Sequence, residues 1–362
     1  MSHRFGHAEP FSLGVEEELL LVQAEGHALS HSASELLPRL AGRAGSAQPD
    51  TYEAVVELTS PICATPAQGV GAVTSLRAEL SGAGATAMGA GIHPAAAFGD
   101  VVHVPARRYE RVAELVRGLL RRTPTCALHV HVGMPDPETA IRCCNGLRAH
   151  LPLLQALAAN SPFWAAADSG FASSRSALFR GYPLAEIPRA FADWGDYEQA
   201  VDEMTRAGGV EDYTFLWWDI RPHPRLGTVE VRAMDAQSSL GSVAGLAALV
   251  QALARDCAEP CAARQTPESR EAITQSLFRA ARDGIEATLW CDGALRPVAE
   301  VAERALTRAT PHAAELGGAD ELEQVRRIVR EGGGASGQRA AHERGGMAAV
   351  LELLVAETAA QP

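Results

Sequence analysis

The sequence has few of the features that mark a secreted or membrane protein. Its seven cysteines are odd in number, scattered and without a CxxC pair, which argues against a disulfide framework and a structural zinc site. The first ten residues are polar and lack the apolar core of a signal peptide. We find no run of about 18 apolar residues that would span a bilayer. The sequence therefore predicts a cytoplasmic protein that does not enter a membrane.

Common signatures of nucleotide binding and of nucleophilic catalysis are also missing. No GxxxxGK[ST] loop occurs and no GxGxxG follows an expected strand, so nucleotide phosphates would have to be held by metal ions and arginines. A Ser-His-Asp arrangement with a nucleophile elbow is not visible. The formal net charge of −12 argues against nucleic acid or an anionic membrane as the main partner, but leaves room for locally clustered arginines.

The order of the expected elements indicates an α+β fold. Strand patterns precede residue 235 and mostly helical patterns follow, so we expect a single catalytic domain, 1–362, with a sheet-bearing core in 11–240 and a mainly helical completion in 241–362. A mostly antiparallel sheet of about six strands is expected at residues 11–22, 52–58, 86–92, 125–133, 213–220 and 227–234. The expected helices are 34–40, 65–82, 107–120, 137–159, 240–256, 269–283, 297–308, 320–331 and 347–358.

Three consecutive acids lie inside the first apolar strand. Alternation places Glu16 and Glu18 on one face and Glu17 on the other. Two buried carboxylates on one face repel each other unless a cation compensates them, and Mg²⁺ favours such oxygen ligands. A solvated edge strand is the alternative interpretation. We expect Glu16 and Glu18 to bind a metal and Glu17 to be a bystander that faces away.

Two further strands carry side chains that can bind a metal. In one, Glu53 and Glu57 are separated by an even number of residues and should share a face, while Asp50 precedes the strand. In the other, His129 and His131 project from the same side. An HxH pair alone fits zinc or two hydrogen-bonded sheet histidines. Beside a carboxylate cluster, one histidine fits a metal ligand and the other a phosphate donor.

Acid and base alternate in the last strand, GTVEVR. Glu230 and Arg232 share one face, and Arg221 lies near the end of the preceding strand. A carboxylate beside a guanidinium fits a metal together with an anionic phosphate group. A cross-strand salt bridge is the alternative interpretation.

These elements, in this order, resemble the type 2 glutamate–cysteine ligases, or carboxylate–amine ligases, of the glutamine synthetase-like superfamily. The resemblance spans residues 13–240, is strongest in GVEEE, HVHVG, ANSPF and WDIRPHPRLGTVEVR, and continues more weakly to Gly337-Gln338-Arg339. It implies an open, curved antiparallel sheet that forms a funnel flanked by helices. ATP and Mg²⁺, with Mn²⁺ as an alternative metal, would lie at its centre.

The resemblance also implies roles for individual residues. The metal ligands or near-ligands would be Glu16, Glu18, Asp50, Glu57, His129 and Glu230. The catalytic residues would be Glu230, Arg221 and Arg232, with both arginines and His131 contacting phosphates or the acyl phosphate. Arg175 in ASSRSALF would grip the substrate carboxylate, and the amino-acid pocket would be lined by Asp168, Ser169, His131 and Trp218.

Three positions depart from the family pattern. Ala127 and Ala185 stand where glycine is usual, and ADSG at 167–170 replaces RDTG. All three lie near the expected substrate pocket, so they bear on the identity of the amino acids more than on the type of reaction.

The implied activity is ATP-dependent amide formation through an acyl phosphate, with glutamate and cysteine, or a related amine, as substrates. A guanidino-kinase-like phosphotransferase, a metal-dependent hydrolase built on HxH and a non-catalytic nucleotide-binding member remain alternatives. The carboxylates argue against the non-catalytic member, because buried charges are costly to keep without a cation. A homodimer is the default assembly, because dimers are the commonest.

Overall fold

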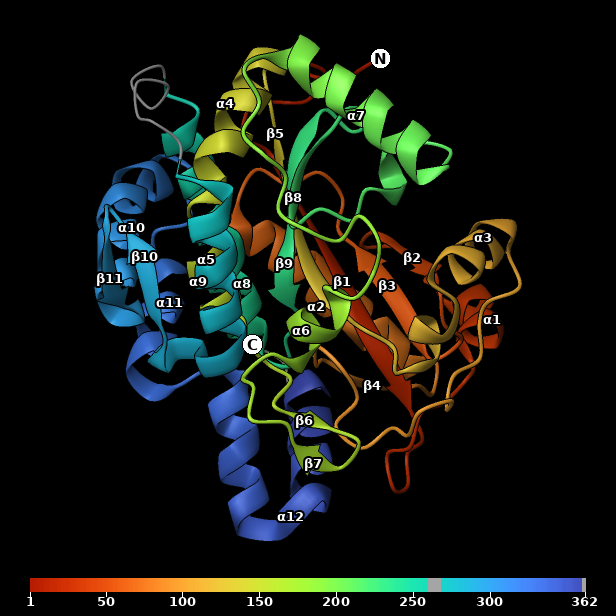
Figure 1. Cartoon of the computed structure of the whole chain (residues 1–362). Helices are drawn as coiled ribbons and strands as arrows, with labels where there is room; N and C mark the ends of the chain where they lie inside the picture. The colour runs from red at the N-terminus through yellow and green to blue at the C-terminus, as the bar shows by residue number, and fades with distance from the viewer. Residues whose placement is uncertain (260–267, 360–362) are drawn as a thin grey trace.

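A seven-stranded sheet lies at the centre of the computed structural model, which describes residues 1–259 and 268–359 (Figure 1). The strand order is β2-β3-β1-β5-β9-β8, with β4 also paired to β1, and every pair is antiparallel. The expected α+β fold with a mostly antiparallel sheet is therefore confirmed. The strands are β1 (Leu13–Val22), β2 (Ser46–Pro49), β3 (Val55–Thr59), β4 (Thr86–Met88), β5 (Ala127–Gly133), β8 (Ile220–His223) and β9 (Thr228–Asp235).

Many helices pack on one face of this sheet, and the other face carries polar side chains at its middle beside an apolar cluster that includes Leu20, Val22 and Met88. Val15, Val130 and Val231 are fully buried in a core shared with α4, α5 and α8, which contact β5 and β9. Because side chains alternate along a strand, Glu16 and His129 point to the opposite face. The helices are α1 (Ala33–Leu36), α2 (Pro66–Gly82), α3 (Arg107–Val116), α4 (Pro137–Arg148), α5 (Leu151–Leu157), α6 (Ser174–Phe179), α7 (Trp194–Gly208), α8 (Leu240–Cys257), α9 (Arg270–Asp283), α10 (Val298–Glu315), α11 (Leu322–Glu331) and α12 (Gly334–Ala359).

One long helix, α8, bears on the expectation that no segment of the chain would span a membrane. It has 18 residues with a mean hydropathy of 1.2, and among the described helices it alone is long and apolar enough to cross a bilayer. It is 72% buried and contacts α2, α4, α10, α11 and β5. These contacts make α8 the central helix of the core.

Several expected elements have different boundaries. The helix expected over 137–159 is two helices, because Pro152 lacks the N–H that a continuous helix would need in the first turn of α5. The strand expected over 213–220 is a short 3-10 helix, η3 (Tyr213–Phe215), followed by β8. The remaining 3-10 helices are η1 (Leu37–Arg39), η2 (Arg117–Arg121) and η5 (Gly284–Glu286).

Some elements were not expected from the sequence. The helix α7 begins at its N-cap Asp193 and ends at Gly209, whose φ of 61° is the left-handed conformation of a helix C-terminus. Two small hairpins, β6 (Phe163–Trp164) with β7 (Ala167–Asp168) and β10 (Thr288–Cys291) with β11 (Ala294–Pro297), lie off the main sheet. The second hairpin interrupts an otherwise helical C-terminal third, as the left side of Figure 1 shows.

Two acids, Glu17 and Glu53, have partners that were not expected from the sequence. Glu17 is fully buried and pairs with Arg77 of α2, so it is a structural ion pair and more than a bystander. The strand β3 begins only at Val55, so Glu53 lies before it and does not share a strand face with Glu57. The carboxylate of Glu53 instead accepts hydrogen bonds from the backbone N–H and hydroxyl of Ser34, at 2.9 and 2.6 Å.

Candidate functional site

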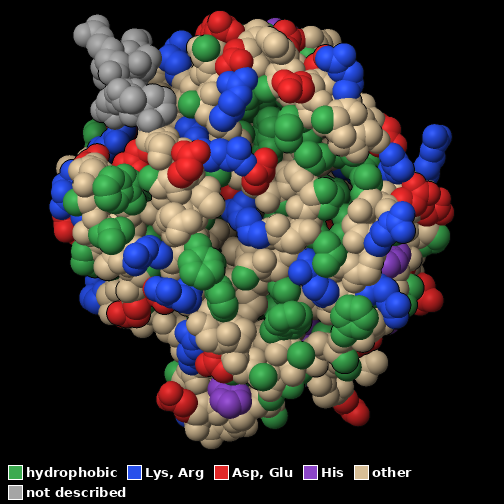
Figure 2. All heavy atoms as spheres, in the orientation of Figure 1, with side chains coloured by type: hydrophobic (Ala, Val, Ile, Leu, Met, Phe, Trp, Pro, Cys, Tyr) green, Lys and Arg blue, Asp and Glu red, His purple; other side chains and the backbone are tan. Residues whose placement is uncertain are grey.

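A cavity of about 410 Å³ opens on the polar face of the sheet. Acids from β1 and β3, histidines from β5 and arginines from β8 and β9 form its floor. Figure 2 shows the same face as Figure 1, hollowed near its middle, with basic and hydrophobic side chains side by side. Five aromatic residues also line the cavity, namely Tyr52, Tyr109, Phe179, Tyr182 and Trp217.

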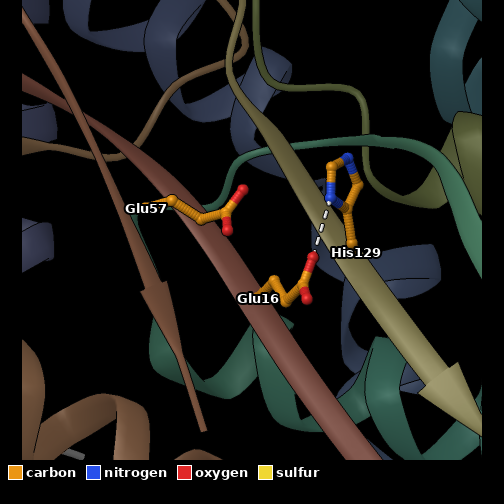
Figure 3. Close-up of side chains that lie close together, drawn as sticks. All are labelled: Glu16, Glu57 and His129. Atoms are coloured by element: carbon orange, nitrogen blue, oxygen red, sulfur yellow. Dashed lines mark hydrogen bonds and ion pairs between the residues drawn. The ribbon is translucent and has the colours of Figure 1, made fainter. Parts of the chain in front are cut away.

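Antiparallel register brings the predicted metal ligands together. Glu16 lies opposite His129 on β5, and Glu18 lies opposite Glu57 on β3. A carboxylate oxygen of Glu16 is 3.3 Å from Nδ1 of His129, and its other oxygen is 3.3 Å from Nε2 of His131. Figure 3 shows Glu16, Glu57 and His129 pointing from three neighbouring strands into one space, where one donor atom from each lies within 4.8 Å of the others.

Three acids at this cluster lie where their negative charge is disfavoured, whereas the two histidines outweigh burial at Glu16 and hold its pKa below the usual value. Burial, together with the nearby Glu16, raises the pKa of Glu57 to about 8. Burial and the charges of Asp50 and Glu57 likewise raise the pKa of Glu18 well above its usual value. The pKa of Asp50 is also raised, chiefly by burial. Without a bound cation, these carboxyl groups are held toward the protonated form.

A second group is centred on Glu230, where cations prevail. Nε of Arg221 donates to Glu230 at 2.7 Å across the β8–β9 pair, and Nη1 of Arg232 donates to the same carboxylate. Burial alone would raise the pKa of Glu230, but the two arginines hold it well below its usual value. The cross-strand salt bridge considered from the sequence is therefore present, and it lines the cavity.

The donor set at the centre of the cavity fits a hard divalent cation. Besides Glu16, Glu57 and His129, another set of possible metal ligands consists of Glu16, His131 and Glu230, whose donor atoms lie within 4.8 Å of one another. Nε2 of His131 is buried and makes no hydrogen bond with the described residues. Carboxylate oxygens suit Mg²⁺, and a mixture of carboxylates with imidazole also suits Mn²⁺. These features fit one or more metal ions held by oxygen and imidazole ligands.

Arg175 enters the same cavity from α6. Its side chain is buried, and its guanidinium lies over the ring of Phe179 at 5.4 Å. Nη2 donates to the backbone oxygen of Arg232 at 3.3 Å, and Nη1 lies 3.7 Å from Asp235. Since the chain contains no lysine, every cationic side chain of the site other than histidine is an arginine.

Three predicted pocket residues lie outside the lining of this cavity. Asp168 is half exposed on the β6–β7 hairpin and pairs with Arg339 of α12 at 3.2 Å. The hydroxyl of Ser169 donates to the backbone oxygen of Pro162 at 2.8 Å. Trp218 is buried in an aromatic cluster beside Phe191, with ring centroids 5.9 Å apart. Their own local partners direct these side chains away from the cavity.

Other lining residues were not identified from the sequence. Trp217, next to Trp218, faces the cavity, as do Arg108 of α3 and His223 of β8. The side chain of Arg108 donates to the hydroxyl of Thr214, which also lines the cavity, at 2.9 Å. Two adjacent tryptophans suggest that one points into the cavity and the other into the core. The path of the backbone after η3 determines that Trp217 is the one that lines the cavity.

Solved structures share this fold. A glutamate–cysteine ligase from Francisella tularensis, in complex with AMP, has a TM-score of 0.71 at 15% identity, covering 97% of this chain and 89% of its own. A bifunctional glutathione synthetase from Pasteurella multocida has a TM-score of 0.68 at 15% identity, covering 96% of this chain and 52% of its own. At this level of identity, these likenesses show that the chain has the fold of these two enzymes.

Sequence relatives identify the family. The family model described as glutamate-cysteine ligase family 2 matches residues 12–357. Two proteins of Rubrobacter xylanophilus, named "Putative glutamate--cysteine ligase 2-3" and "Putative glutamate--cysteine ligase 2-1", are 38% and 36% identical. The first comparison covers 99% of this chain and 100% of the relative, and the second covers 93% and 91%. The chain belongs to glutamate–cysteine ligase family 2 and is an ATP-dependent ligase.

Proposed function

We propose that this ligase joins the γ-carboxylate of glutamate to the amine of cysteine, or of a related amino acid, in a cytoplasmic reaction driven by ATP. The observation that carries the proposal is one cavity in which a carboxylate–imidazole cluster faces a group of arginines. Phosphoryl transfer needs few covalent partners from the protein, and it relies on positioned charges that neutralise the phosphates. The acids and arginines supply charges of both signs within one cavity.

The acidic side of the cavity is the proposed metal site. Glu16, Glu57 and His129 would hold one Mg²⁺ or Mn²⁺, Glu16, His131 and Glu230 would hold another, and Glu18 and Asp50 lie beside them as near-ligands. When bound, the metal supplies positive charge that neutralises the phosphates of ATP during transfer. The raised pKa values of Glu18, Asp50 and Glu57 fit this role. A bound cation would offset the burial and repulsion that favour protonation of these acids in its absence.

The arginines take the complementary part. Arg221 and Arg232 are proposed to neutralise the transferred phosphoryl group and the acyl phosphate, and Arg175 to bind the α-carboxylate of glutamate. Each has a planar guanidinium that can donate two parallel hydrogen bonds to an oxyanion. Nε of Arg232 and Nε of Arg175 are both buried without a hydrogen-bond acceptor among the described residues. These unpaired donors fit guanidinium groups that await an anionic ligand.

The proposed chemistry has two steps. An oxygen of the γ-carboxylate attacks the γ-phosphorus of ATP, the bond from that phosphorus to the β,γ-bridging oxygen breaks, and ADP leaves. The amine nitrogen then attacks the acyl carbon, loses a proton and expels inorganic phosphate as the amide forms. The arginines and the metal ligands hold the reacting groups in line and exclude water from the acyl phosphate.

The experiment is an assay with Mg²⁺-ATP and pairs of amino acids that measures phosphate release and product mass together. Glutamate with cysteine is expected to give stoichiometric ADP, phosphate and dipeptide. ADP without phosphate would instead indicate a phosphotransferase, and turnover without ATP a hydrolase. A panel without any nucleotide turnover would reject catalysis, and turnover with another pair would replace the proposed substrates.

Substitution of the metal ligands tests the site itself. Glu16→Gln is expected to lose ATP turnover by about 100-fold or more while the fold is kept, because the charge of a proposed metal ligand is removed. Glu230→Gln is a poorer probe, because it would leave the buried Arg221 and the partly buried Arg232 without their shared carboxylate. Full activity of Glu16→Gln would reject the metal assignment.

The single-domain organisation and the homodimer stay predictions.

A further inference from the structure

Asp235, the last residue of β9, forms a buried hydrogen-bond network beside the proposed site. One carboxylate oxygen accepts hydrogen bonds from the backbone N–H of Asn160 at 3.0 Å and from the hydroxyl of Ser161 at 2.7 Å. The other accepts from the hydroxyl of Ser173 at 2.8 Å. The residue is 1% exposed, so these three donors replace the water that the charge would otherwise bind. The network fixes the carboxylate in one orientation.

The same network reaches Arg175 through both its backbone and its side chain. The backbone N–H of Arg175 donates to the hydroxyl of Ser161 at 3.2 Å, and Ser173 caps the helix α6 that carries Arg175. The guanidinium approaches Asp235 itself, with 3.7 Å between Nη1 and the nearer carboxylate oxygen. One buried carboxylate therefore contacts both the N-cap of α6 and the guanidinium of Arg175.

Close packing around Asp235 leaves it little freedom. A side chain added at Gly91 would place Cβ 2.6 Å from both Cγ and Oδ2 of Asp235, and 2.8 Å from the hydroxyl of Ser161. Real Cβ atoms do not approach other atoms so closely, so this position admits glycine alone without a shift of the network. The absence of a side chain at Gly91 therefore leaves the space that the carboxylate of Asp235 occupies.

The ion pair orients Arg175 without using up its hydrogen-bond donors. Three other donors already bind the oxygens of Asp235, and its contact with Arg175 is an ion pair at 3.7 Å. Among the described residues, Nη2 of Arg175 donates only to the backbone oxygen of Arg232, at 3.3 Å, and its buried Nε has no partner. The guanidinium is thus fixed in place with donors left for a ligand in the cavity.

We propose that Asp235 is a positioning residue, which holds Arg175 in the orientation that binds the carboxylate of the substrate. This inference rests on the proposed function in one respect, the assignment of the substrate carboxylate to Arg175. Asp235 does not line the cavity, so its effect on the substrate would pass through Arg175. The competing explanation is that Asp235 only anchors the protein fold around Asn160 and Ser173.

Steady-state kinetics of Asp235→Asn distinguish the two explanations. The expected result is a rise in the KM for glutamate of about 10- to 100-fold, the value of a hydrogen bond to a charged group, with little change in the KM for ATP. Arg175→Ala should show the same pattern, and the double variant should be no worse than Arg175→Ala alone. Independent, multiplicative effects of the two substitutions would overturn the proposal.

A measurement that needs no turnover separates this inference from the proposed function. Phenylglyoxal modification of the full-length protein, followed by peptide mass mapping, is expected to modify Arg175 several times faster in Asp235→Asn. Asp219→Asn is the matched control, because Asp219 is a buried acid that lines a small pocket together with Arg175 but pairs with Arg180, at 2.5 Å. It should leave the reactivity of Arg175 unchanged.

Each outcome decides one of the two proposals. If the wild-type protein does not use glutamate but Arg175 becomes more reactive in Asp235→Asn, the positioning role stands and the substrate assignment fails. Unchanged reactivity of Arg175 would overturn the positioning role even where glutamate is a substrate. If Asp235→Asn does not fold, Ser173→Ala replaces it, because it removes one donor to Asp235 and keeps the charge. The expected effects then have the same direction and a smaller size.

Discussion

Arg77 donates hydrogen bonds to both carboxylate oxygens of Glu17, at 2.9 and 2.7 Å, on the face of β1 opposite to Glu16. The same guanidinium donates to the backbone oxygens of Gln237 and Ser238, each at 2.7 Å. One buried ion pair therefore joins β1, α2 and the segment that follows β9. β1 carries Glu16 and β9 carries Glu230. The ion pair between Glu17 and Arg77 therefore helps to hold these two proposed metal ligands at a fixed distance from each other.

Replacement of Glu17 by Gln is expected to destabilise the protein by about 3–5 kcal/mol, because it leaves the buried charge of Arg77 uncompensated. Urea unfolding followed by circular dichroism measures this loss. Asp202→Asn is the control, because Asp202 forms an exposed ion pair with Arg206 on α7, and exposed pairs contribute little to stability. Equal losses in the two variants would contradict the structural role of Glu17.

Two neighbouring tryptophans are expected to respond in opposite ways. Trp218→Ala should cost about 3–5 kcal/mol of stability, because it opens a cavity within a buried aromatic cluster. Trp217→Ala should cost much less stability but weaken substrate binding, because Trp217 lines the cavity. Unfolding curves and KM values for both variants test this. A larger loss of activity in Trp218→Ala at unchanged stability would restore the sequence-based assignment of the pocket.

Alternation along strands accounts for the parts of the site that were predictable from the sequence. Glu16, His129 and Glu230 each lie next to a buried valine in their strand, so their common face follows from a period of two. Once the strands pair side by side, these side chains must meet. The family motifs added the order of the strands, which the alternation alone does not provide.

The remaining parts depend on partners that are distant in the sequence. Asp168 is drawn to Arg339, 171 residues away, and Glu17 to Arg77, 60 residues away. No local pattern encodes such pairs, because each residue alone is compatible with an exposed or a ligand-binding role. The position of Glu53 depended on where β3 begins, and strand boundaries are set by tertiary contacts more than by propensity.

Glu57→Gln is expected to stabilise the metal-free protein and to remove most of its stabilisation by Mg²⁺. The substitution relieves repulsion among buried acids but deletes a proposed ligand. Thermal unfolding with and without Mg²⁺ measures both effects, and for the wild type Mg²⁺ at 100 times its Kd should add about 2.7 kcal/mol. Glu53→Gln is the control, because its carboxylate bonds to Ser34. An unaltered Mg²⁺ response in Glu57→Gln would contradict the assigned ligand.

The raised pKa of Glu57 also predicts how the stability of the metal-free protein depends on pH. The pKa is about 8 in the folded protein and near the ordinary 4.5 when unfolded, so between these values the folded state binds more protons. Stability from this group is complete below the unfolded pKa and is lost as the pH rises through 8. Bound Mg²⁺ requires the ionised carboxylate, so Mg²⁺ affinity should instead rise over the same interval.

Unfolding free energies at about pH 6.5–9, with and without Mg²⁺, test whether the stability of the metal-free protein falls with pH while the Mg²⁺ affinity rises. Burial lowers the pKa of His131, but the charges of Glu16 and Glu230 raise it above its usual value overall, so His131 adds a decline of the same sign in this interval. Glu57→Gln should reduce the decline seen without metal by the share that Glu57 contributes, while Glu53→Gln should keep the decline unchanged. If the metal-free protein grew more stable as the pH rose toward 8, the crowding of carboxylates would not be the dominant electrostatic feature of the site. A divalent cation would then lose its main physical justification.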